Sequence, residues 1–194
     1  MLSSRMYWAV AHWRRGALRW WHTADKATWS AMLLLGLVLG GFGFALQAHF
    51  AREDGRREAA REAERRNVDC LARNVYFEAR GEPVAGMYAV AEVTMNRKAS
   101  RLYPDSVCAV VYQKNWDGLR GRFVGAFSWT EFNSMPAPGG EAWERAQEVA
   151  EAVYYRRVSP TVPGALHFHA SYIKPEWAKE RKQVARIGRH VFYR

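Results

Sequence analysis

An uncharged apolar stretch is the feature that most constrains this chain. Residues 27–51 contain no Asp, Glu, Lys or Arg, and their centre is a run of Leu, Val, Gly and Phe between Met32 and Leu46. About 20 apolar residues are enough to cross the hydrocarbon core of a bilayer as a helix. A surface helix of a soluble protein would carry a polar face, which this stretch lacks. The pattern therefore predicts one N-terminal transmembrane helix over residues 27–51.

The charges on either side of this stretch predict its orientation. Five basic residues and one acidic residue precede residue 27, whereas residues 52–67 hold six basic and five acidic residues. Because Lys and Arg are retained on the cytoplasmic side, we expect residues 1–26 in the cytoplasm and the C-terminal bulk in the periplasm or cell envelope. Interfacial tryptophans are expected at Trp20, Trp21 and Trp29.

The length of the apolar stretch favours an uncleaved signal anchor. A cleaved signal peptide has an apolar run of about 7–15 residues and a small-residue cleavage site, and neither is found here. Gly36 and Gly40 form one GxxxG pattern, which could be the face of a homodimer, although glycine is common in membrane helices in any case. The lipid bilayer is thus one expected partner, through residues 27–51.

Residues 52–67 are rich in Ala, Glu and Arg, and they predict a solvated helical stalk. Glu53 with Arg57 and Glu62 with Arg66 have the spacing of favourable helical ion pairs. The formal net charge of +10 is spread along the chain, and residues 67–194 hold eighteen basic and thirteen acidic residues. A nucleic-acid partner is not expected, because the basic outer domain would lie on the wrong side of the membrane.

The remaining residues, 68–194, predict one small α+β domain that is mostly helical with a small C-terminal β element. Helices are expected over residues 69–80, 83–98, 105–112 and 141–158, from capping residues and apolar periodicity. Residues 113–140 are interpreted as rich in loops. Alternation predicts a strand at residues 166–169, and residues 183–193 predict a partner strand that is broken near Gly188.

Glu78 is the first candidate for chemistry. On a helix it shares a narrow apolar stripe with Leu71 and Val75. Loss of solvation raises the pKa of a carboxyl group, and an acid that is protonated near neutral pH can donate a proton to a glycosidic oxygen. A buried glutamate is more often paired with arginine, and Arg73 and Arg80 are nearby in the sequence.

Six segments of residues 69–194 closely resemble the SleB/CwlJ cell wall hydrolase family. They are residues 70–83 (CLARNVYFEARGEP), 89–97 (AVAEVTMNR), 103–113 (YPDSVCAVVYQ), 127–130 (FSWT), 164–169 (GALHFH) and 187–193 (IGRHVFY). The resemblance implies a peptidoglycan-cleaving domain with a lysozyme-like, lytic-transglycosylase-like fold. It also implies that Glu78 is the general acid. Phe77 stands where spore-cortex enzymes of this family often have glycine, which concerns the shape of the cleft.

A single catalytic carboxylate fits such a fold. If the N-acetyl group of the substrate assists, a second enzyme carboxylate is dispensable. Glu78 would protonate the leaving oxygen of the MurNAc–GlcNAc bond and then act as a base, on the C6 hydroxyl or on water. Glu82 is the auxiliary carboxylate. Because it follows the expected helix end, we expect it to be solvated and ionised, with Arg80 or Arg97 as its alternative structural partner.

Aromatic and polar side chains suggest a cleft for sugars, with peptidoglycan glycan strands as the binding partner. Tyr76, Trp129 and Tyr172 could stack on pyranose rings, and Trp129 is the strongest candidate because its segment is polar and loop-like. The side chains that could hydrogen-bond N-acetyl and hydroxyl groups are Asn96, Ser128 and Thr130. Taken individually, each aromatic is more often a core residue than a ligand contact.

Two other functions remain open. His167, His169 and His190 could bind zinc in a metallo-amidase, but no His-Glu-x-x-His pattern accompanies them, so no metal or other cofactor is expected. A non-catalytic wall-binding protein would use the same cleft only to hold glycan.

The two cysteines, Cys70 and Cys108, are too few for a disulfide-rich scaffold. An oxidising compartment permits a single bond between them, and both flank helices that should pack together. We therefore predict a Cys70–Cys108 disulfide that holds the Glu78 helix against the third helix of the domain.

Overall fold

The computed structural model describes residues 12, 13, 15, 19, 25–118, 120–132 and 134–194. Two compact units divide the chain, residues 1–58 and residues 59–194, and each is considered by itself. Most of the expected cytoplasmic segment, including Trp20 and Trp21, lies outside the described residues.

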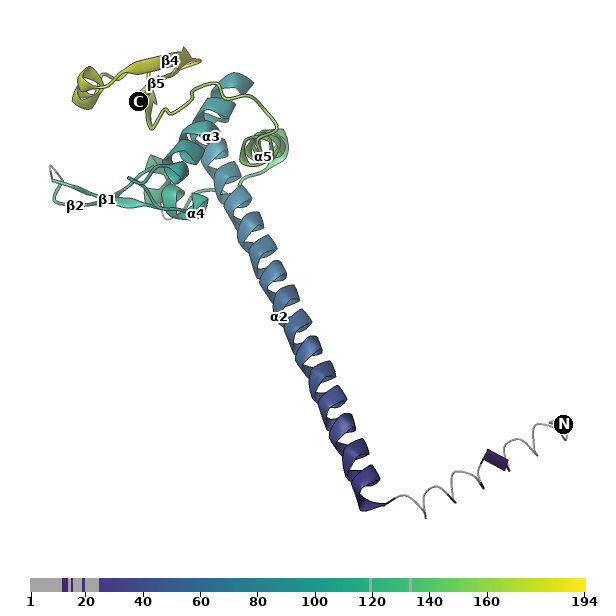
Figure 1. Ribbon diagram of the computed structural model, residues 1–194. Coiled ribbons are helices and arrows are strands. Elements are labelled where there is room, and N and C mark those ends of the chain that lie inside the picture. Colours follow the sequence, from purple (N-terminus) through teal and green to yellow (C-terminus); the bar gives the residue numbers. More distant parts are fainter. Residues whose placement is uncertain (1–11, 14, 16–18, 20–24, 119, 133) are drawn as a thin grey trace, which may run out of the picture. The chain divides into compact units, whose positions relative to one another are not determined.

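Helix α2 spans Lys26–Ala79 and is 54 residues long (Figure 1). Its apolar part is long and apolar enough to cross a membrane, and none of that part is buried in the structure. The predicted long apolar N-terminal helix is thus confirmed. A Cβ atom added at Gly36 or Gly40 would meet nothing within 4 Å, so this face of the helix is open.

The stalk residues are helical, but the expected helix start at Asp69 is wrong. Helix α2 passes through Asp69 without a break, and the Asp69 carboxylate accepts a hydrogen bond of 2.7 Å from Arg73 Nε instead of capping a helix. Residues 52–67 hold strong helix formers and no proline, so nothing ends the helix there. Of the expected ion pairs, Glu62 contacts Arg66 at 3.4 Å, whereas Glu53 contacts Arg56 rather than Arg57.

Three further helices surround the core of the second unit. They are α3 (Val84–Ala99), α4 (Val107–Val111) and α5 (Gly140–Tyr154), close to the expected ranges. Ser106 caps α4, since its hydroxyl accepts a hydrogen bond from the backbone N–H of Ala109. The residues that are fully buried between these helices and the end of α2 include Leu71, Val75, Val90, Val93, Val149 and Phe192.

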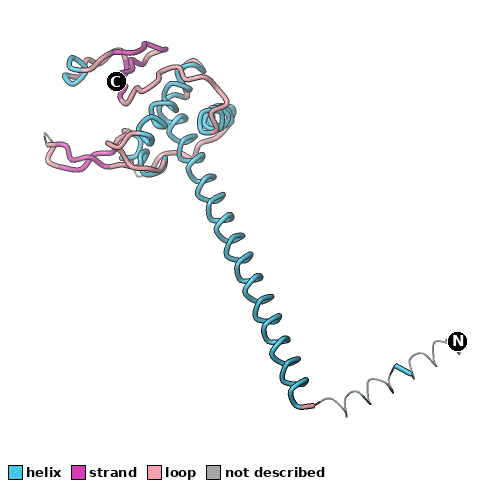
Figure 2. The backbone as a smooth tube through the Cα atoms, viewed as in Figure 1, coloured by secondary structure: helices cyan, strands magenta, loops and turns pink. Residues whose placement is uncertain are grey.

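Strands form two small antiparallel sheets (Figure 2). The C-terminal sheet has the order β3–β5–β4, with β3 at His167–Ala170, β4 at Gln183–Ile187 and β5 at His190–Tyr193. A short 3-10 helix, η2 (Glu176–Glu180), precedes β4. This sheet confirms the predicted C-terminal β element and its break at Gly188, so the unit is a mostly helical α+β domain.

The second sheet was not predicted. Strands β1 (Lys114–Asp117) and β2 (Arg122–Gly125) form a hairpin within the segment that was interpreted as loop-rich, and the 3-10 helix η1 (Ser128–Glu131) follows it. Most side chains of the hairpin are exposed. A strand without a buried face shows no apolar alternation, so its sequence does not reveal it.

The predicted disulfide is confirmed. Cys70 on α2 and Cys108 on α4 are bonded, with their Cα atoms 5.2 Å apart and a sequence separation of 38. The bond ties α2 to α4 eight residues before Glu78.

Candidate active site

Glu78 lies in the last turn of α2 and is half-buried. Leu71 and Val75, on the same stripe, are fully buried, as the periodicity predicted. Among the described residues, no hydrogen bond or ion pair reaches the Glu78 carboxyl group. Burial raises the pKa of Glu78 to about 7, although the positive charge of Arg97 opposes this shift. Near neutral pH the group can therefore both donate and accept a proton.

The two arginines nearest in sequence do not pair with Glu78. Arg73 binds the carboxylate of Asp69. Arg80 donates a hydrogen bond of 3.2 Å to the hydroxyl of Tyr76, and its guanidinium lies over the Tyr76 ring. The structural role that sequence reasoning kept open for Glu78, a pairing with Arg73 or Arg80, is thus not realised.

Arg97 is the cation of the site, and sequence reasoning considered it only as a partner of Glu82. Its side chain is buried, and its Nε donates a hydrogen bond of 2.8 Å to the carbonyl of Leu166. The guanidinium lies 5.1 Å from the ring centre of Phe127 and 5.4 Å from that of Tyr103. Packing between these rings holds the charge close enough to act on Glu78 without an ion pair. The only clue in the sequence was its place in the segment 89–97.

Glu82 is not solvated, contrary to expectation. Its side chain is 3% exposed, and its two oxygens accept hydrogen bonds of 2.8 Å each from the backbone N–H and the Nε of Arg189. Burial by itself would raise the pKa of Glu82, but these bonds and the charges of His190 and Arg189 hold it below its ordinary value. Glu82 is therefore ionised as expected, with Arg189 instead of Arg80 or Arg97 as its partner. These two hydrogen bonds between Glu82 and Arg189, called the Glu82 clamp below, fasten the turn between α2 and α3 to the turn between β4 and β5.

Gly188 makes the Glu82 clamp possible. It has a φ of +57°, and a Cβ atom there would overlap the Glu82 carboxylate and come within 3.0 Å of Pro83 Cδ. We expect Gly188→Ala to lower the free energy of unfolding by about 1–3 kcal/mol and to reduce activity, because the turn after Glu78 loses its anchor. Chemical denaturation measures the first effect.

Gly121→Ala is the matched control for Gly188→Ala. Gly121 has a φ of +60°, but a Cβ atom there would meet nothing. Equal losses in the two variants would show that the clamp contributes nothing beyond backbone conformation.

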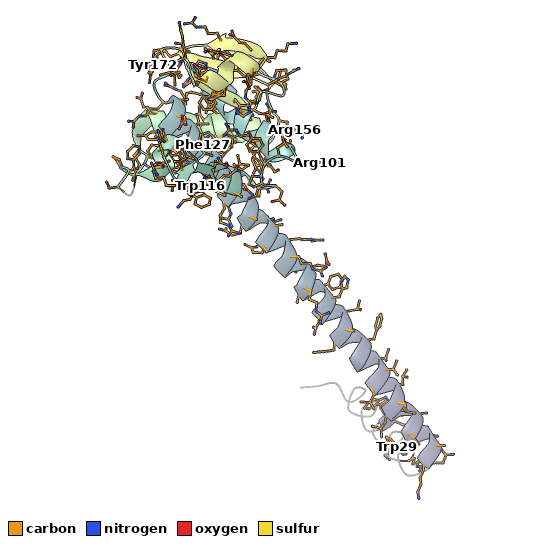
Figure 3. The ribbon with its side chains drawn as sticks, turned by 90° about the vertical axis from the view of Figure 1, so that its left-hand side faces the viewer. Trp29, Arg101, Trp116, Phe127, Arg156 and Tyr172 are labelled. Carbon is orange, nitrogen blue, oxygen red and sulfur yellow. A yellow bond between two sulfur atoms is a disulfide. The ribbon has the colours of Figure 1, made fainter. Side chains whose placement is uncertain are left out.

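The aromatic candidates differ in exposure. Trp129, in η1, is 9% exposed; its ring stacks on Phe77 at 4.6 Å, and its indole N–H donates to Asn74 Oδ1 at 3.0 Å. Tyr76 is also buried. Both rings are thus committed to the core beside Glu78, which favours a supporting role for them over the stacking role that the sequence suggested. Tyr172, by contrast, is 83% exposed (Figure 3).

The three polar candidates also differ. Asn96 donates to the carbonyl oxygens of Val162 and Ala165, and the hydroxyl of Thr130 donates to the carbonyl of Phe127. These groups hold loops in place. Ser128 is exposed at the start of η1 and remains available to a ligand.

The histidines are engaged in the C-terminal sheet. Nε2 of His169 lies 3.0 Å from the Tyr193 hydroxyl, and His190 lies against Glu82 with Nδ1 3.9 Å from its carboxylate. Burial and the charges of Arg181 and Arg97 lower the pKa of His167 to about 4. Among the described residues, no group of three or more His, Cys, Asp or Glu side chains is arranged to hold a metal ion.

Comparison with known proteins places this chain in a family. The sequence profile of the Cell Wall Hydrolase family matches residues 81–193, more than half of the chain, so the protein belongs to that family. Glu82 falls inside the matched range, and Glu78 falls three residues before it.

Individual relatives agree with this assignment. The chain is 28% identical over 129 residues to a spore cortex-lytic enzyme of Oceanobacillus iheyensis and 29% identical over 129 residues to that of Bacillus subtilis. Each alignment covers 65% of this chain but only 41% and 37% of the two relatives. The chain thus spans about two fifths of the length of the curated relatives that it matches.

Solved structures match the fold. The catalytic domain of Bacillus cereus SleB and that of the germination-specific lytic transglycosylase SleB of Bacillus anthracis both align with a TM-score of 0.53 and 25% identity. Each alignment covers 66% of this chain, and it covers 89% and 93% of the two solved chains. The resemblance to SleB-type enzymes noted from the sequence is therefore confirmed at the level of family and fold.

Proposed function

We propose that this protein is a membrane-anchored enzyme that cleaves the MurNAc–GlcNAc bond of peptidoglycan, as a hydrolase or a lytic transglycosylase, with Glu78 as general acid and base. The observation that supports this most is the state of Glu78: a half-buried carboxyl group, without an ion pair among the described residues, whose pKa burial raises to about 7. Membership of the cell wall hydrolase family supplies the substrate class.

In the proposed reaction, protonated Glu78 donates its proton to the glycosidic oxygen as the bond to the anomeric carbon breaks. The substrate's N-acetyl group stabilises the positive charge at that carbon. The Glu78 carboxylate then removes a proton either from the C6 hydroxyl, whose oxygen closes a 1,6-anhydro ring, or from a water molecule. Either route returns the proton to Glu78, so the cycle is balanced without a second enzyme carboxylate.

The other candidates take supporting roles in this proposal. Glu82, held by Arg189, is already ionised and serves to position the turn that follows Glu78. Tyr172 and Ser128 are the exposed candidates for contact with sugar rings and hydroxyl groups. Arg97 keeps the ionised form of Glu78 accessible, because its charge opposes the effect of burial on the pKa.

Digestion of purified peptidoglycan by the full-length protein in detergent, followed by mass spectrometry of the released fragments, tests the proposal. Fragments that end in a 1,6-anhydro sugar, lighter by one water, identify transglycosylation, and reducing ends identify hydrolysis. Intact glycan after prolonged digestion would contradict the enzymatic assignment and favour a protein that only binds peptidoglycan.

The pKa of Glu78 predicts the pH dependence of the rate. The general acid must be protonated, so the rate of cleavage should fall above pH 7, by about tenfold per pH unit. Initial rates on solubilised glycan strands between pH 5 and 9 measure this. A rate that stays constant from pH 6 to 9 would contradict an acid with this pKa.

Anchoring through residues 27–51 predicts the topology. A reporter that is active only outside the cytoplasm should work when fused after Arg194, because the basic residues that precede the apolar stretch are retained inside. A second reporter, active only in the cytoplasm, should fail at the same position. Activity of the cytoplasmic reporter alone would reverse the predicted orientation.

A further inference from the structure

A cavity whose lining does not include Glu78 lies against α3. It has a volume of about 810 Å³ and is formed by α3, the end of α5 and the loop over residues 156–164. Glu92, Asn96 and Ala99 of α3 line it. Arg97, whose charge acts on Glu78, is not among the lining residues. The cavity is therefore distinct from the candidate active site, and its size is within the range of ligand pockets.

Cationic side chains line this cavity. They are Lys98, Arg156 and Arg157. Arg157 lies 3.7 Å from the carboxylate of Glu151, but neither Lys98 nor Arg156 has a carboxylate partner within the part of the chain that the structure describes. In the view of Figure 3, Arg156 lies on the opposite side of the domain from Tyr172. Glu92 also lines the cavity, but three cations against this one carboxylate leave the lining with a net positive charge, which favours an anionic ligand.

Hydrogen bonds from α3 hold the loop over residues 161–165 that forms part of the cavity wall. Glu92 is 8% exposed, and its Oε2 accepts hydrogen bonds from the backbone N–H groups of Thr161 at 2.6 Å and Val162 at 2.9 Å. Asn96 holds the same loop through the carbonyl oxygens of Val162 and Ala165. Because the loop is tied to α3 before any ligand arrives, binding there needs little ordering. The second oxygen of Glu92, Oε1, is buried and has no partner among the described residues.

We propose that this cavity binds an acidic peptide, namely the peptide stem that muramic acid carries in peptidoglycan. The inference rests on the proposed function, which supplies the polymer. Stem peptides concentrate the carboxylates of peptidoglycan, and Lys98 and Arg156 offer two separate cations to receive them. Met95, Val153 and Val158, which also line the cavity, offer apolar contact to alanine methyl groups.

Strands that carry stems should bind more tightly than strands without them, because a stem that enters the cavity adds contacts to those made by the glycan. The stem would then select which glycan strands are cleaved.

The test compares glycan strands that carry stems with the same strands after removal of the stems, using the full-length protein in detergent. For the unaltered protein, KM should be at least tenfold lower on stem-bearing strands. Lys98→Gln/Arg156→Gln should raise that KM at least tenfold and leave kcat on stem-free strands unchanged. The matched control is Arg145→Gln/Arg186→Gln, which removes two exposed arginines outside the cavity and should leave the preference intact.

Two results would overturn the inference. One is an unaltered protein with equal KM on both kinds of strand, and the other is an equal loss of preference in the cavity variant and the control variant. Direct titration with the tripeptide Ala–D-Glu–diaminopimelate separates this inference from the proposed function. If the protein cleaves neither kind of strand, the proposed function fails. Peptide binding that the cavity variant loses would still support the site, and absence of binding would refute it.

Discussion

Glu78→Gln is expected to lower the turnover of purified peptidoglycan by at least about a hundredfold, the lower end of general acid–base contributions. Glutamine keeps the size and shape of the side chain but can neither donate nor accept the required proton. Glycan binding should be retained. Measured release of soluble fragments, together with co-sedimentation of the variant with peptidoglycan, separates catalysis from binding.

The stability of the same variant gives an independent readout. Burial raises the pKa of Glu78 from its ordinary value of 4.5 to about 7, so the fold favours the protonated form. The corresponding stability is fully present below pH 4.5 and is lost as the pH rises through 7. Glu78→Gln carries no charge, so above pH 7 it should be as stable as the unaltered protein or more stable. An inactive variant that is also unfolded would not support a catalytic role.

Two further variants distinguish the competing mechanisms. Glu82→Gln should retain more activity than Glu78→Gln, because Glu82 is a bound, ionised group and not the proton donor. His169→Ala should also retain substantial activity, because His169 contacts Tyr193 and is assigned no metal. If Glu78→Gln stays active while the His169 variant is inactive and chelators inhibit the unaltered protein, a metal mechanism replaces the glycosidase assignment. An unchanged biological effect of Glu78→Gln would instead favour a binding protein.

Loss of the Cys70–Cys108 disulfide is expected to destabilise the second unit by roughly 3–4 kcal/mol. The bond closes a loop with a sequence separation of 38, and the loss of chain entropy in the unfolded state sets this magnitude. Because Glu78 lies eight residues after Cys70 on the same helix, loosening of α2 against α4 should lower activity as well.

Denaturant unfolding of the full-length protein with and without reductant measures the contribution of the disulfide. The buried Trp129 offers a fluorescence signal for this transition. Cys70→Ala/Cys108→Ala is the control, since reductant should not change its unfolding midpoint. Alkylation of both thiols in unreduced, denatured protein would show that the bond is absent in solution.

Features that neighbouring residues determine could be predicted from the sequence, and features without such a local pattern could not. Glu78 could be placed on a buried stripe from the spacing of Leu71, Val75 and Glu78 alone, because helical periodicity is a property of neighbouring residues. The exposed β1–β2 hairpin was missed, since it has no buried face to impose a pattern. The false helix start at Asp69 shows that a residue suited to capping does not cap when the residues before it also favour a helix.

The sequence by itself determined the long apolar N-terminal helix, the mostly helical domain with its C-terminal sheet, the disulfide and the family. These depend on local periodicity, composition and motifs, and are therefore written in short stretches of residues. Only the tertiary structure decided the electrostatic state of the site: Arg97 near Glu78, the Glu82 carboxylate bound to Arg189, and Trp129 hydrogen-bonded to Asn74. Glu82 and Arg189 are 107 positions apart in sequence, and Asn74 and Trp129 are 55 positions apart. Glu78 and Arg97 are 19 positions apart. Packing brings such groups together, and burial then sets their pKa values, which no local pattern encodes.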